Sequence, residues 1–233
     1  MDAIARLDWD AIEAELDARG CARAGAVLGA DACARLMALY RDDARFRSRV
    51  DMERHRFGRG DYAYFAHPLP EAVTELRRAL YPRLAPIANR WLERLRRSER
   101  YPAQLDAYLE RCHAAGQTRP TPLLLHYEKG GWNALHRDLY GPLVFPLQAM
   151  VMLCRPGVDF TGGQFLVVEN RARQQSIGHA LSPEQGELVL FAVNERPVAG
   201  KRSFTRASLR HGVSQIESGE RYTLGLIFHD ARG

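Results

Sequence analysis

The pattern of apolar residues changes at about Gly116, and this change constrains the fold more than any other feature of the chain. Beyond it lie five short apolar runs separated by Gly, Pro, Asn or Asp. Runs of this length with turn residues between them indicate β-strands, and a series of them predicts an all-β sandwich or barrel. The five runs are TPLLLHYE, FPLQAMVMLC, GQFLVVE, GELVLFAV and RYTLGLIFHD.

The region before this change is mainly helical in its periodicity. Asp31 is expected to cap a helix that runs through Tyr40, and a later helical pattern is interrupted by Pro82 and Pro86. We expect a helical N-terminal region over 1–115 packed on a β core over 116–233, and no linker separates them, which predicts one cooperative unit. The expected helices cover residues 9–18, 31–40, 71–97 and 103–112, with a strand over 21–28 and another at 62–65.

Composition and charge exclude several classes of protein. The chain has 46% hydrophobic and 26% charged residues, which is typical of a packed globular protein. No apolar run reaches the length of a membrane span, and the first ten residues do not resemble a secretory signal. The four cysteines are scattered without CxxC spacing, which favours a reducing cytoplasm over a disulfide framework or a zinc site. The net charge of +5 is spread along the chain, so no nucleic-acid-binding tail is expected.

The segment GGWNALHRDLYG contains His136, Arg137 and Asp138, and two kinds of site begin in this way. His-Arg-Asp-Leu opens the catalytic loop of protein kinases, whereas His-x-Asp opens mononuclear iron sites. The kinase interpretation fails because Leu143 stands where a kinase has its magnesium-binding Asn. In addition, VDFTGG lacks the glycine of Asp-Phe-Gly, and neither of the two lysines lies in a Val-Ala-Ile-Lys context.

The iron interpretation follows from strand geometry. His136 and Asp138 are two residues apart, so an extended backbone turns both side chains to the same face. Two histidines and one carboxylate on one face of an octahedron form the facial triad of non-haem Fe(II) oxygenases. His211, in SLRHGVSQI, is the candidate for the third ligand because it lies on a later predicted strand after a polar loop.

Two further residues indicate that an anion binds close to this metal site. Arg221 follows His211 by ten residues and lies in the apolar strand RYTLGLIF. An inward arginine there is costly unless an anion pairs with it, and its planar fork matches a carboxylate. Tyr127, on the strand before His136, could donate a hydrogen bond to the same carboxylate.

Together these parts resemble the 2-oxoglutarate/Fe(II)-dependent oxygenase superfamily, over about residues 116–231. The stretches FTGGQFLVVEN and GELVLFAVNERPVAG are also similar to that superfamily. The resemblance implies a double-stranded β-helix (jelly-roll) core, mainly β with α, with Fe(II) held by His136, Asp138 and His211. It implies 2-oxoglutarate bound by Arg221 and Tyr127, and hydroxylation of a substrate C–H with release of succinate and CO2.

The substrate is left open between three classes. RHGVSQIESGERYTLGLIFHDA resembles a bacterial family grouped with the AlkB-like nucleic-acid oxygenases, which implies alkylated DNA or RNA as substrate. The chain departs from the AlkB pattern at Leu125, Thr223 and Ile227, and its His-to-Arg interval is closer to that of prolyl-hydroxylase-like members. A protein side chain and a small metabolite are therefore the alternatives, and a metal-binding sensor barrel without turnover is the alternative outside enzymes.

Several other features have both a structural and a functional interpretation. The basic run from Arg196 to Arg210, and the aromatic segment 55–70 with Tyr62, Tyr64 and Phe65, could contact nucleic acid or could be a solvated loop and core. We expect His126 to face away from the barrel interior and His229 to cap the last strand or reach the surface. Asn133 is expected to form a turn, with contact to 2-oxoglutarate or substrate as the alternative, while Gln148 is a candidate pocket residue with a core amide as the equal alternative.

Overall fold

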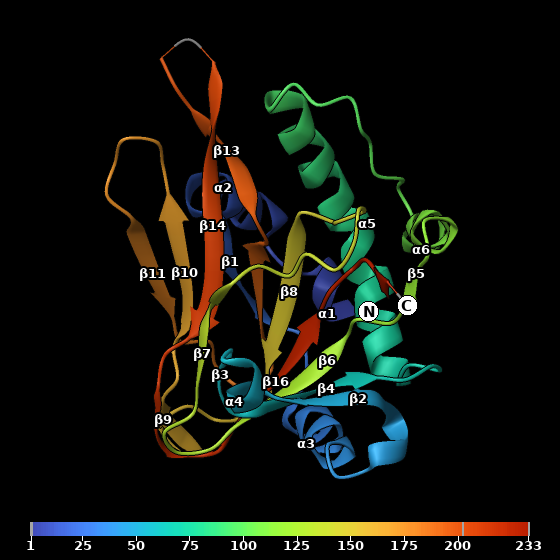
Figure 1. Ribbon diagram of the computed structural model, residues 1–233, viewed down its shortest axis with the longest axis vertical. Coiled ribbons are helices and arrows are strands. Elements are labelled where there is room, and N and C mark those ends of the chain that lie inside the picture. Colours follow the sequence, from blue (N-terminus) through green and yellow to red (C-terminus); the bar gives the residue numbers. More distant parts are fainter. Residues whose placement is uncertain (1, 202, 233) are drawn as a thin grey trace.

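Two antiparallel sheets face each other in the computed structural model, which describes residues 2–201 and 203–232 (Figure 1). The larger sheet has the strand order β1-β12-β8-β16-β6-β4-β2, and the smaller has the order β11-β10-β14-β7-β3, with β13 paired to β14. In the second half the chain crosses repeatedly between the sheets, as in a jelly roll, because β7, the pair β10 and β11, and the pair β13 and β14 of the smaller sheet lie in sequence between strands of the larger sheet. The predicted fold class is therefore confirmed.

The helices of five or more residues are α2 (Trp9–Arg19), α3 (Ala30–Leu39), α5 (Glu71–Arg94) and α6 (Leu105–Ala114). Short helical turns are α1 (Asp2–Ala5), η1 (Asp43–Arg45) and α4 (Met52–His55). The larger sheet is formed by β1 (Cys21–Ala26), β2 (Phe46–Asp51), β4 (Asp61–Phe65), β6 (Leu123–Tyr127), β8 (Leu147–Met152), β12 (Glu187–Ala192) and β16 (Arg221–Leu226). The smaller is formed by β3 (Gly58–Arg59), β7 (Trp132–His136), β10 (Phe165–Asn170), β11 (Ile177–Leu181), β13 (Glu195–Ala199) and β14 (Phe204–Val213). Two small pairs join β9 (Phe160–Gly162) to β15 (Ile216–Gly219) and β5 (Gln117–Arg119) to β17 (Ala231–Arg232).

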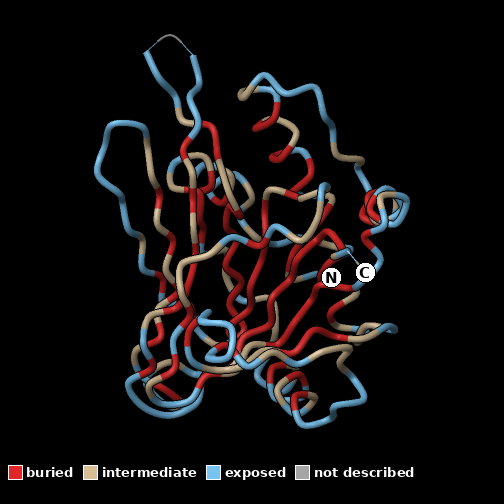
Figure 2. The backbone as a smooth tube through the Cα atoms, in the orientation of Figure 1, coloured by how far each residue is buried: buried red, intermediate tan, exposed pale blue. Residues whose placement is uncertain are grey.

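Strand alternation divides the larger sheet into an inner and an outer face. On β6, Leu123 and Leu125 line a cavity between the sheets, whereas Leu124 is fully buried among core residues that include those of the helices. The central strands β8 and β12 are buried along their whole length, as Figure 2 shows. The sheet therefore has an apolar core behind it and a cavity in front of it.

The first half of the chain is not only helical, because it also supplies strands to both sheets. β1 pairs with β12 at one edge of the larger sheet, and β4 pairs with β6 near the other edge. β2 lies in the charged stretch 41–56, for which no element was expected, because its alternation of apolar and polar residues is weak. The strand predicted at 62–65 corresponds to β4.

Two expectations about helices were wrong. Helix α3 has Gly29 as its N-cap residue, and Asp31 lies within the first turn. Helix α5 runs from Glu71 to Arg94 without interruption, with Pro82 and Pro86 inside it. Each proline removes one backbone hydrogen bond, but the apolar face of α5 is buried along its length, and this packing keeps the helix continuous.

The structure also describes the state of the four cysteines and the character of the helices. The four cysteines are buried and free, as their spacing predicted. In the part of the chain that the structure describes, no helix combines the length and the apolar character that a membrane crossing requires.

Candidate active site

His136, Asp138 and His211 meet at one end of the cavity, because β7 and β14 pair in the register His136↔His211. Nε2 of His211 lies 3.3 Å from Oδ2 of Asp138, and Nε2 of His136 lies 3.6 Å from Oδ1 of the same carboxylate. One ligand atom from each of the three lies within 4.8 Å of the others. The structure thus brings together the three residues that the sequence predicted as a metal triad.

The orientation of these side chains is fixed by neighbouring groups. Nδ1 of His136 lies 2.7 Å from the carbonyl of Ala134, so the ring donates there and turns the lone pair of Nε2 toward Asp138. The phenol of Tyr140 donates to Oδ1 of Asp138 at 2.6 Å, and Tyr64 donates to Tyr140 at 2.9 Å. The sequence analysis missed Tyr140, although it continues the two-residue spacing of His136 and Asp138.

The protonation states also suit metal ligation. Burial raises the pKa of Asp138, but a hydrogen bond from His211, the charges of both histidines and the bond from Tyr140 outweigh it, so the pKa lies well below its ordinary value. Burial lowers the pKa of His211, and the charge of His136 adds to this. At neutral pH the site therefore presents an ionised carboxylate beside a neutral imidazole, and metals require ligands in these forms.

A cavity of about 420 Å³ extends from the triad between the two sheets. Its walls are largely apolar and aromatic, with a few polar side chains directed into it, as is usual for ligand sites. The polar lining includes Asn133, Gln148, Arg221 and Thr223.

Arg221 lies in the wall of this cavity and is fully buried. Its Nε, Nη1 and Nη2 atoms have no hydrogen-bond partner among the described residues, and burial lowers the pKa of its guanidinium to about 10. Tyr127 pairs with Arg221 across β6 and β16, and the guanidinium carbon lies 5.6 Å from the centre of its ring. A buried cation without a partner is costly, so this arrangement requires an anion.

Asn133 is a second polar part of the same wall, and Tyr127 lies buried beside it without lining the cavity itself. The amide of Asn133 donates to the phenol oxygen of Tyr127 at 3.1 Å, which leaves the phenol proton free to donate. Burial raises the pKa of Tyr127 to about 12, so the phenol is neutral at physiological pH. Asn133 lies in β7 and not in a turn, so the expectation of a turn role was wrong.

Gln148 is a pocket residue, as one of its two interpretations predicted. It lies on β8, is 2% exposed, and its Nε2 atom has no hydrogen-bond partner in the described chain. Its neighbour across the sheet, Phe191, also lines the cavity. An amide donor without a partner at this position is available to a ligand.

The aromatic segment 55–70 divides between the cavity and the core. Tyr62 and Tyr64 line the cavity from β4, and Arg56 and Phe57 line it from the turn before β3. Phe65 instead is fully buried and stacks on Phe46 with ring centres 4.9 Å apart. Phe65 is therefore a core residue, as the structural interpretation predicted, while Tyr62 and Tyr64 line the cavity, and their contact with nucleic acid stays a prediction.

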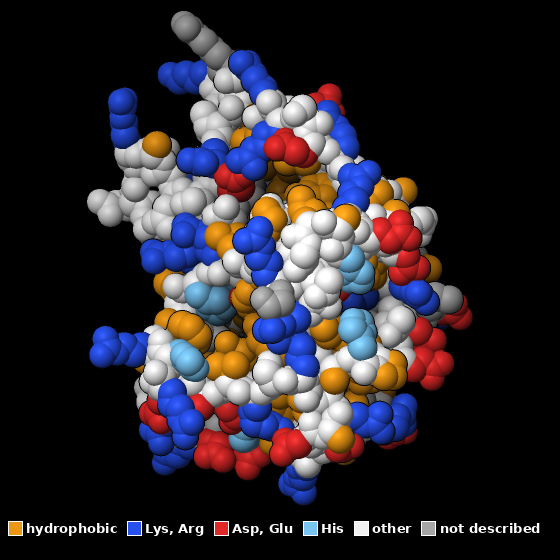
Figure 3. Space-filling model, turned by 45° about the vertical axis from the view of Figure 1, so that its right-hand side comes forward, with side chains coloured by type: hydrophobic (Ala, Val, Ile, Leu, Met, Phe, Trp, Pro, Cys, Tyr) orange, Lys and Arg blue, Asp and Glu red, His pale blue; other side chains and the backbone are white. Residues whose placement is uncertain are grey.

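The basic run from Arg196 to Arg210 does not form one surface. Arg196 is 2% exposed, and its Nε atom donates to Glu169 at 2.6 Å. Arg206 is exposed on the β13–β14 hairpin at the top of Figure 1, and Arg210 is half-buried without lining the cavity. Arg202 belongs to the same run but lies outside the described residues. On the face drawn in Figure 3, basic side chains are scattered with acidic ones among them.

Two further histidines lie outside the cavity, which was expected for His126, whereas His229 is buried and does not reach the surface. His126 does not line the cavity, and its ring stacks on Tyr222 with centres 4.4 Å apart. His229 follows β16 and is fully buried, and its Nδ1 atom accepts a hydrogen bond from the backbone of Phe145 at 3.3 Å. His229 therefore fixes the chain after the last strand of the larger sheet.

Several solved structures have a similar architecture. The chain is similar to a prolyl-4-hydroxylase of Pseudomonas putida, with 19% identity, a TM-score of 0.53, and 97% of this chain and 100% of that chain covered. It is also similar to an oxidoreductase of the 2OG-Fe(II) oxygenase family from Burkholderia pseudomallei, with 16% identity, a TM-score of 0.53, and coverages of 96% and 92%. These structures show that the chain has the fold found in 2OG-Fe(II) oxygenases, which is the fold that the sequence predicted.

A family model identifies the particular group within this class. Residues 60–231 match the Oxygenase-NA family, which is described as an oxygenase catalysing oxidative methylation of damaged DNA. The match covers well over half of the chain, and the chain therefore belongs to the Oxygenase-NA family. It is 52% identical over 167 residues to "Uncharacterized protein Rv2227" of Mycobacterium tuberculosis strain H37Rv, with 72% of each chain covered, and equally to "Uncharacterized protein MT2286" of strain CDC 1551.

The cofactor prediction agrees with both the family and the site. The chain belongs to a family of oxygenases, and its cavity is lined by a His–Asp–His cluster and by a buried arginine that has no hydrogen-bond partner among the described residues. Two imidazoles and one carboxylate are a ligand set of non-haem Fe(II). The buried guanidinium is complementary to the distal carboxylate of 2-oxoglutarate.

Proposed function

We propose that His136, Asp138 and His211 hold Fe(II), and that Arg221 and Tyr127 bind the distal carboxylate of 2-oxoglutarate. The observation that carries this proposal is the fully buried guanidinium of Arg221, which has no partner among the described residues and lines the same cavity as the triad. Without an anionic ligand, burial of this charge has no compensation.

The side chains of the site would hold the metal ligands and 2-oxoglutarate in position and would not react themselves. Ala134 and Tyr140 hold His136 and Asp138, so the ligand set is already arranged before a metal binds. Arg221 and the neutral phenol of Tyr127 would fix the far end of 2-oxoglutarate, and the apolar walls exclude water around it. When bound, Fe(II) and 2-oxoglutarate together supply oxygen activation coupled to decarboxylation of 2-oxoglutarate to succinate and CO2.

We further propose that the substrate is an alkylated nucleic acid. The family description supports damaged DNA, and the cavity lining adds aromatic and basic side chains, namely Tyr62, Tyr64, Phe57 and Arg56. Such side chains suit a base turned out of its stack and the phosphates beside it. Hydroxylation converts the N–CH3 group to N–CH2OH, and loss of formaldehyde then restores the N–H group.

Hydroxylation of a protein side chain is the second candidate. One structure of similar fold is a prolyl hydroxylase from Trichoplax adhaerens in complex with a peptide fragment of hypoxia inducible factor, with 17% identity and a TM-score of 0.52. The comparison covers 95% of this chain and 89% of that one. A peptide substrate requires no phosphate contacts, so ionic strength distinguishes the two candidates.

Succinate formation tests the cofactor and the substrate together. Purified chain with Fe(II), 2-oxoglutarate and oxygen is given single-stranded oligonucleotides with N-methylated bases, unmethylated oligonucleotides, or proline-containing peptides. We expect succinate and formaldehyde only with the methylated oligonucleotides, and affinity that falls steeply with salt. His211→Ala and Arg221→Ala should abolish both products, and Arg210→Ala, adjacent in sequence but outside the cavity, should not.

Two results would contradict parts of this proposal. Succinate formed with peptides alone would overturn the nucleic-acid substrate and keep the cofactor site. Normal turnover by both His211→Ala and Arg221→Ala would overturn the cofactor site itself.

A further inference from the structure

A second group of metal-ligating side chains lies on the outer face of the larger sheet. His126 and Glu128 are two residues apart in the chain, and Glu220 immediately precedes β16, which pairs with β6. One ligand atom from each of these three side chains lies within 4.8 Å of the others. The same spacing of a histidine and an acid occurs at His136 and Asp138, where His211 on the paired strand β14 is the third residue, whereas Glu220 lies one residue before its strand.

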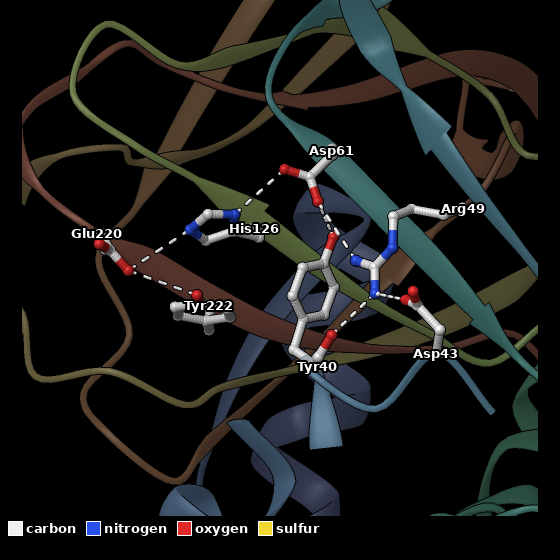
Figure 4. Close-up of polar contacts among 7 residues, drawn as sticks. All are labelled: Tyr40, Asp43, Arg49, Asp61, His126, Glu220 and Tyr222. Atoms are coloured by element: carbon white, nitrogen blue, oxygen red, sulfur yellow. Dashed lines mark hydrogen bonds and ion pairs between the residues drawn. The ribbon is translucent and has the colours of Figure 1, made fainter. Parts of the chain in front are cut away.

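The histidine of this cluster is oriented by a carboxylate, as metal-bound histidines usually are. Nδ1 of His126 lies 3.2 Å from Oδ2 of Asp61, while its Nε2 atom is buried and makes no hydrogen bond among the described residues (Figure 4). Glu220 has the nearest carboxylate oxygen to that Nε2 atom, at 3.5 Å. An Nδ1–H donated to Asp61 leaves the Nε2 lone pair directed at the two glutamates.

Neighbouring side chains hold the carboxylates of Asp61 and Glu220 in place. Tyr40 donates to the other oxygen of Asp61, and Arg49 lies 3.7 Å from that oxygen. The phenol of Tyr222 donates to Glu220 at 3.4 Å and stacks on the ring of His126. Figure 4 shows these side chains converging from the end of α3, from β2, β4 and β6, and from the start of β16 with the residue before it. Nδ1 of His126 therefore faces Asp61, and its Nε2 atom faces the space beside the two glutamates.

Charge gives an independent reason for a cation at this point. Glu128 and Glu220 flank the cross-strand pair Tyr127↔Arg221 on adjacent strands, so two carboxylates of the same sign lie close together. Like charges across neighbouring strands are destabilising. A divalent ion between them would remove this repulsion and use the free Nε2 atom at the same time.

We propose that His126, Glu128 and Glu220 form a second metal site, separate from the active site, that binds a divalent transition metal of the Zn(II) class. One imidazole and two carboxylates suit Zn(II) better than Mg(II), because Mg(II) prefers oxygen ligands alone. Both glutamates are exposed, so water can complete the coordination. The site ties β6 to β16 behind Tyr127 and Arg221, which point to the opposite face of the same two strands.

The test measures metal stoichiometry in chain stripped of metal, with Zn(II) alone as the probe. Because the triad also binds metal ions, the experiment uses a background in which His136→Ala and Asp138→Ala remove two of its ligands. We expect this background to bind one Zn(II) per chain in equilibrium dialysis. Adding Glu220→Gln or His126→Gln should weaken that binding by at least tenfold, and the added Glu217→Gln should leave it unchanged because Glu217 is exposed outside the cluster.

A second measurement guards against loss of folding in the variants. Co(II) bound to the background should give visible absorption of low coordination number that Glu220→Gln abolishes, while circular dichroism stays the same. If the background binds no Zn(II) at micromolar concentration, the cluster is an ion-pair network around a protonated His126 and the proposal is wrong. It is also wrong if the bound Zn(II) is insensitive to both His126→Gln and Glu220→Gln.

Discussion

At the scale of single residues, the cavity depends on which side chains the strand period turns inward. His136, Asp138 and Tyr140 are two residues apart, and so are Arg221 and Thr223. This parity made the triad and the arginine predictable from the sequence. The partner of each residue was less predictable, since the bond from Tyr140 to Asp138 depends on how the chain turns after β7.

The first prediction at this scale concerns Arg221. Replacing it by Lys keeps the charge but loses the planar fork, so 2-oxoglutarate should bind at least tenfold more weakly, and Arg221→Ala should cost about 2–5 kcal/mol of binding free energy. Calorimetry with Mn(II) in place of Fe(II) measures both affinities without turnover. Arg137→Lys, on a neighbouring part of the lining, is the matched control. Unchanged affinity in Arg221→Ala would refute its role.

The second prediction concerns His229 and pH. Burial lowers the pKa of His229 to about 4, whereas an unfolded chain protonates its histidine near its ordinary value of about 6.5. The contribution of neutral His229 is therefore present above about pH 6.5 and is lost as the pH falls toward 4, by about 1.4 kcal/mol per pH unit within that window.

His229→Asn keeps an acceptor for the backbone of Phe145 and cannot protonate. Its free energy of unfolding should vary less with pH between 6.5 and 4 than that of the unmodified chain. Urea titrations at four pH values measure the difference, with the exposed His55→Asn as control. Identical pH slopes for His229→Asn and the unmodified chain would contradict this account.

At the scale of elements, one buried arginine joins α2 to the smaller sheet. Arg196 on β13 donates to Glu169 on β10 and also to the carbonyls of Asp17 and Ala18 at the end of α2, at 2.7 and 2.6 Å. The same guanidinium therefore joins two strands and satisfies carbonyls that a helix end leaves free.

Removing the carboxylate of this pair should be strongly destabilising. Glu169→Gln leaves Arg196 buried without its counter-charge, and we expect a loss of about 3–5 kcal/mol in the free energy of unfolding. Chemical denaturation measures this loss, and the exposed Glu217→Gln should change stability by less than about 0.5 kcal/mol. A loss below about 1 kcal/mol for Glu169→Gln would show that water solvates the guanidinium.

The elements also show where the sequence was informative. The strands β6, β8, β10, β12 and β16 were predicted because their apolar runs are bounded by turn residues. β2 was not, since Arg, Ser and Asp interrupt its pattern, and its pairing with β4 is a tertiary effect. Pro82 and Pro86 were read as breaks because sequence alone does not show how much apolar surface α5 buries.

At the scale of the whole molecule, the two halves of the chain share one sheet. The four strands from the second half, β12-β8-β16-β6, have β1 on one side and β4 followed by β2 on the other, all from the first half. Both edges of the central strands are therefore covered, and β4 also brings Tyr62 and Tyr64 into the cavity.

This arrangement predicts that residues 116–233 do not fold alone. The fragment would expose two long apolar strand edges, and exposed edges of this kind aggregate. We expect the full chain to unfold in a single transition by tryptophan fluorescence and circular dichroism, and the fragment to lack cooperative unfolding. Two separate transitions in the full chain, or a monomeric folded fragment, would show that the halves are independent.

The guanidinium of Arg221, for which the described part of the chain offers no counter-ion, has a consequence for the lifetime of the protein. A ligand that binds only the native state lowers the fraction of chains that open, and proteases degrade opened chains. If 2-oxoglutarate supplies the missing counter-ion, the chain should resist digestion in proportion to the concentration of this metabolite. The amount of enzyme in a cell would then follow the supply of 2-oxoglutarate, so that carbon metabolism would set the capacity of the enzyme as well as its rate.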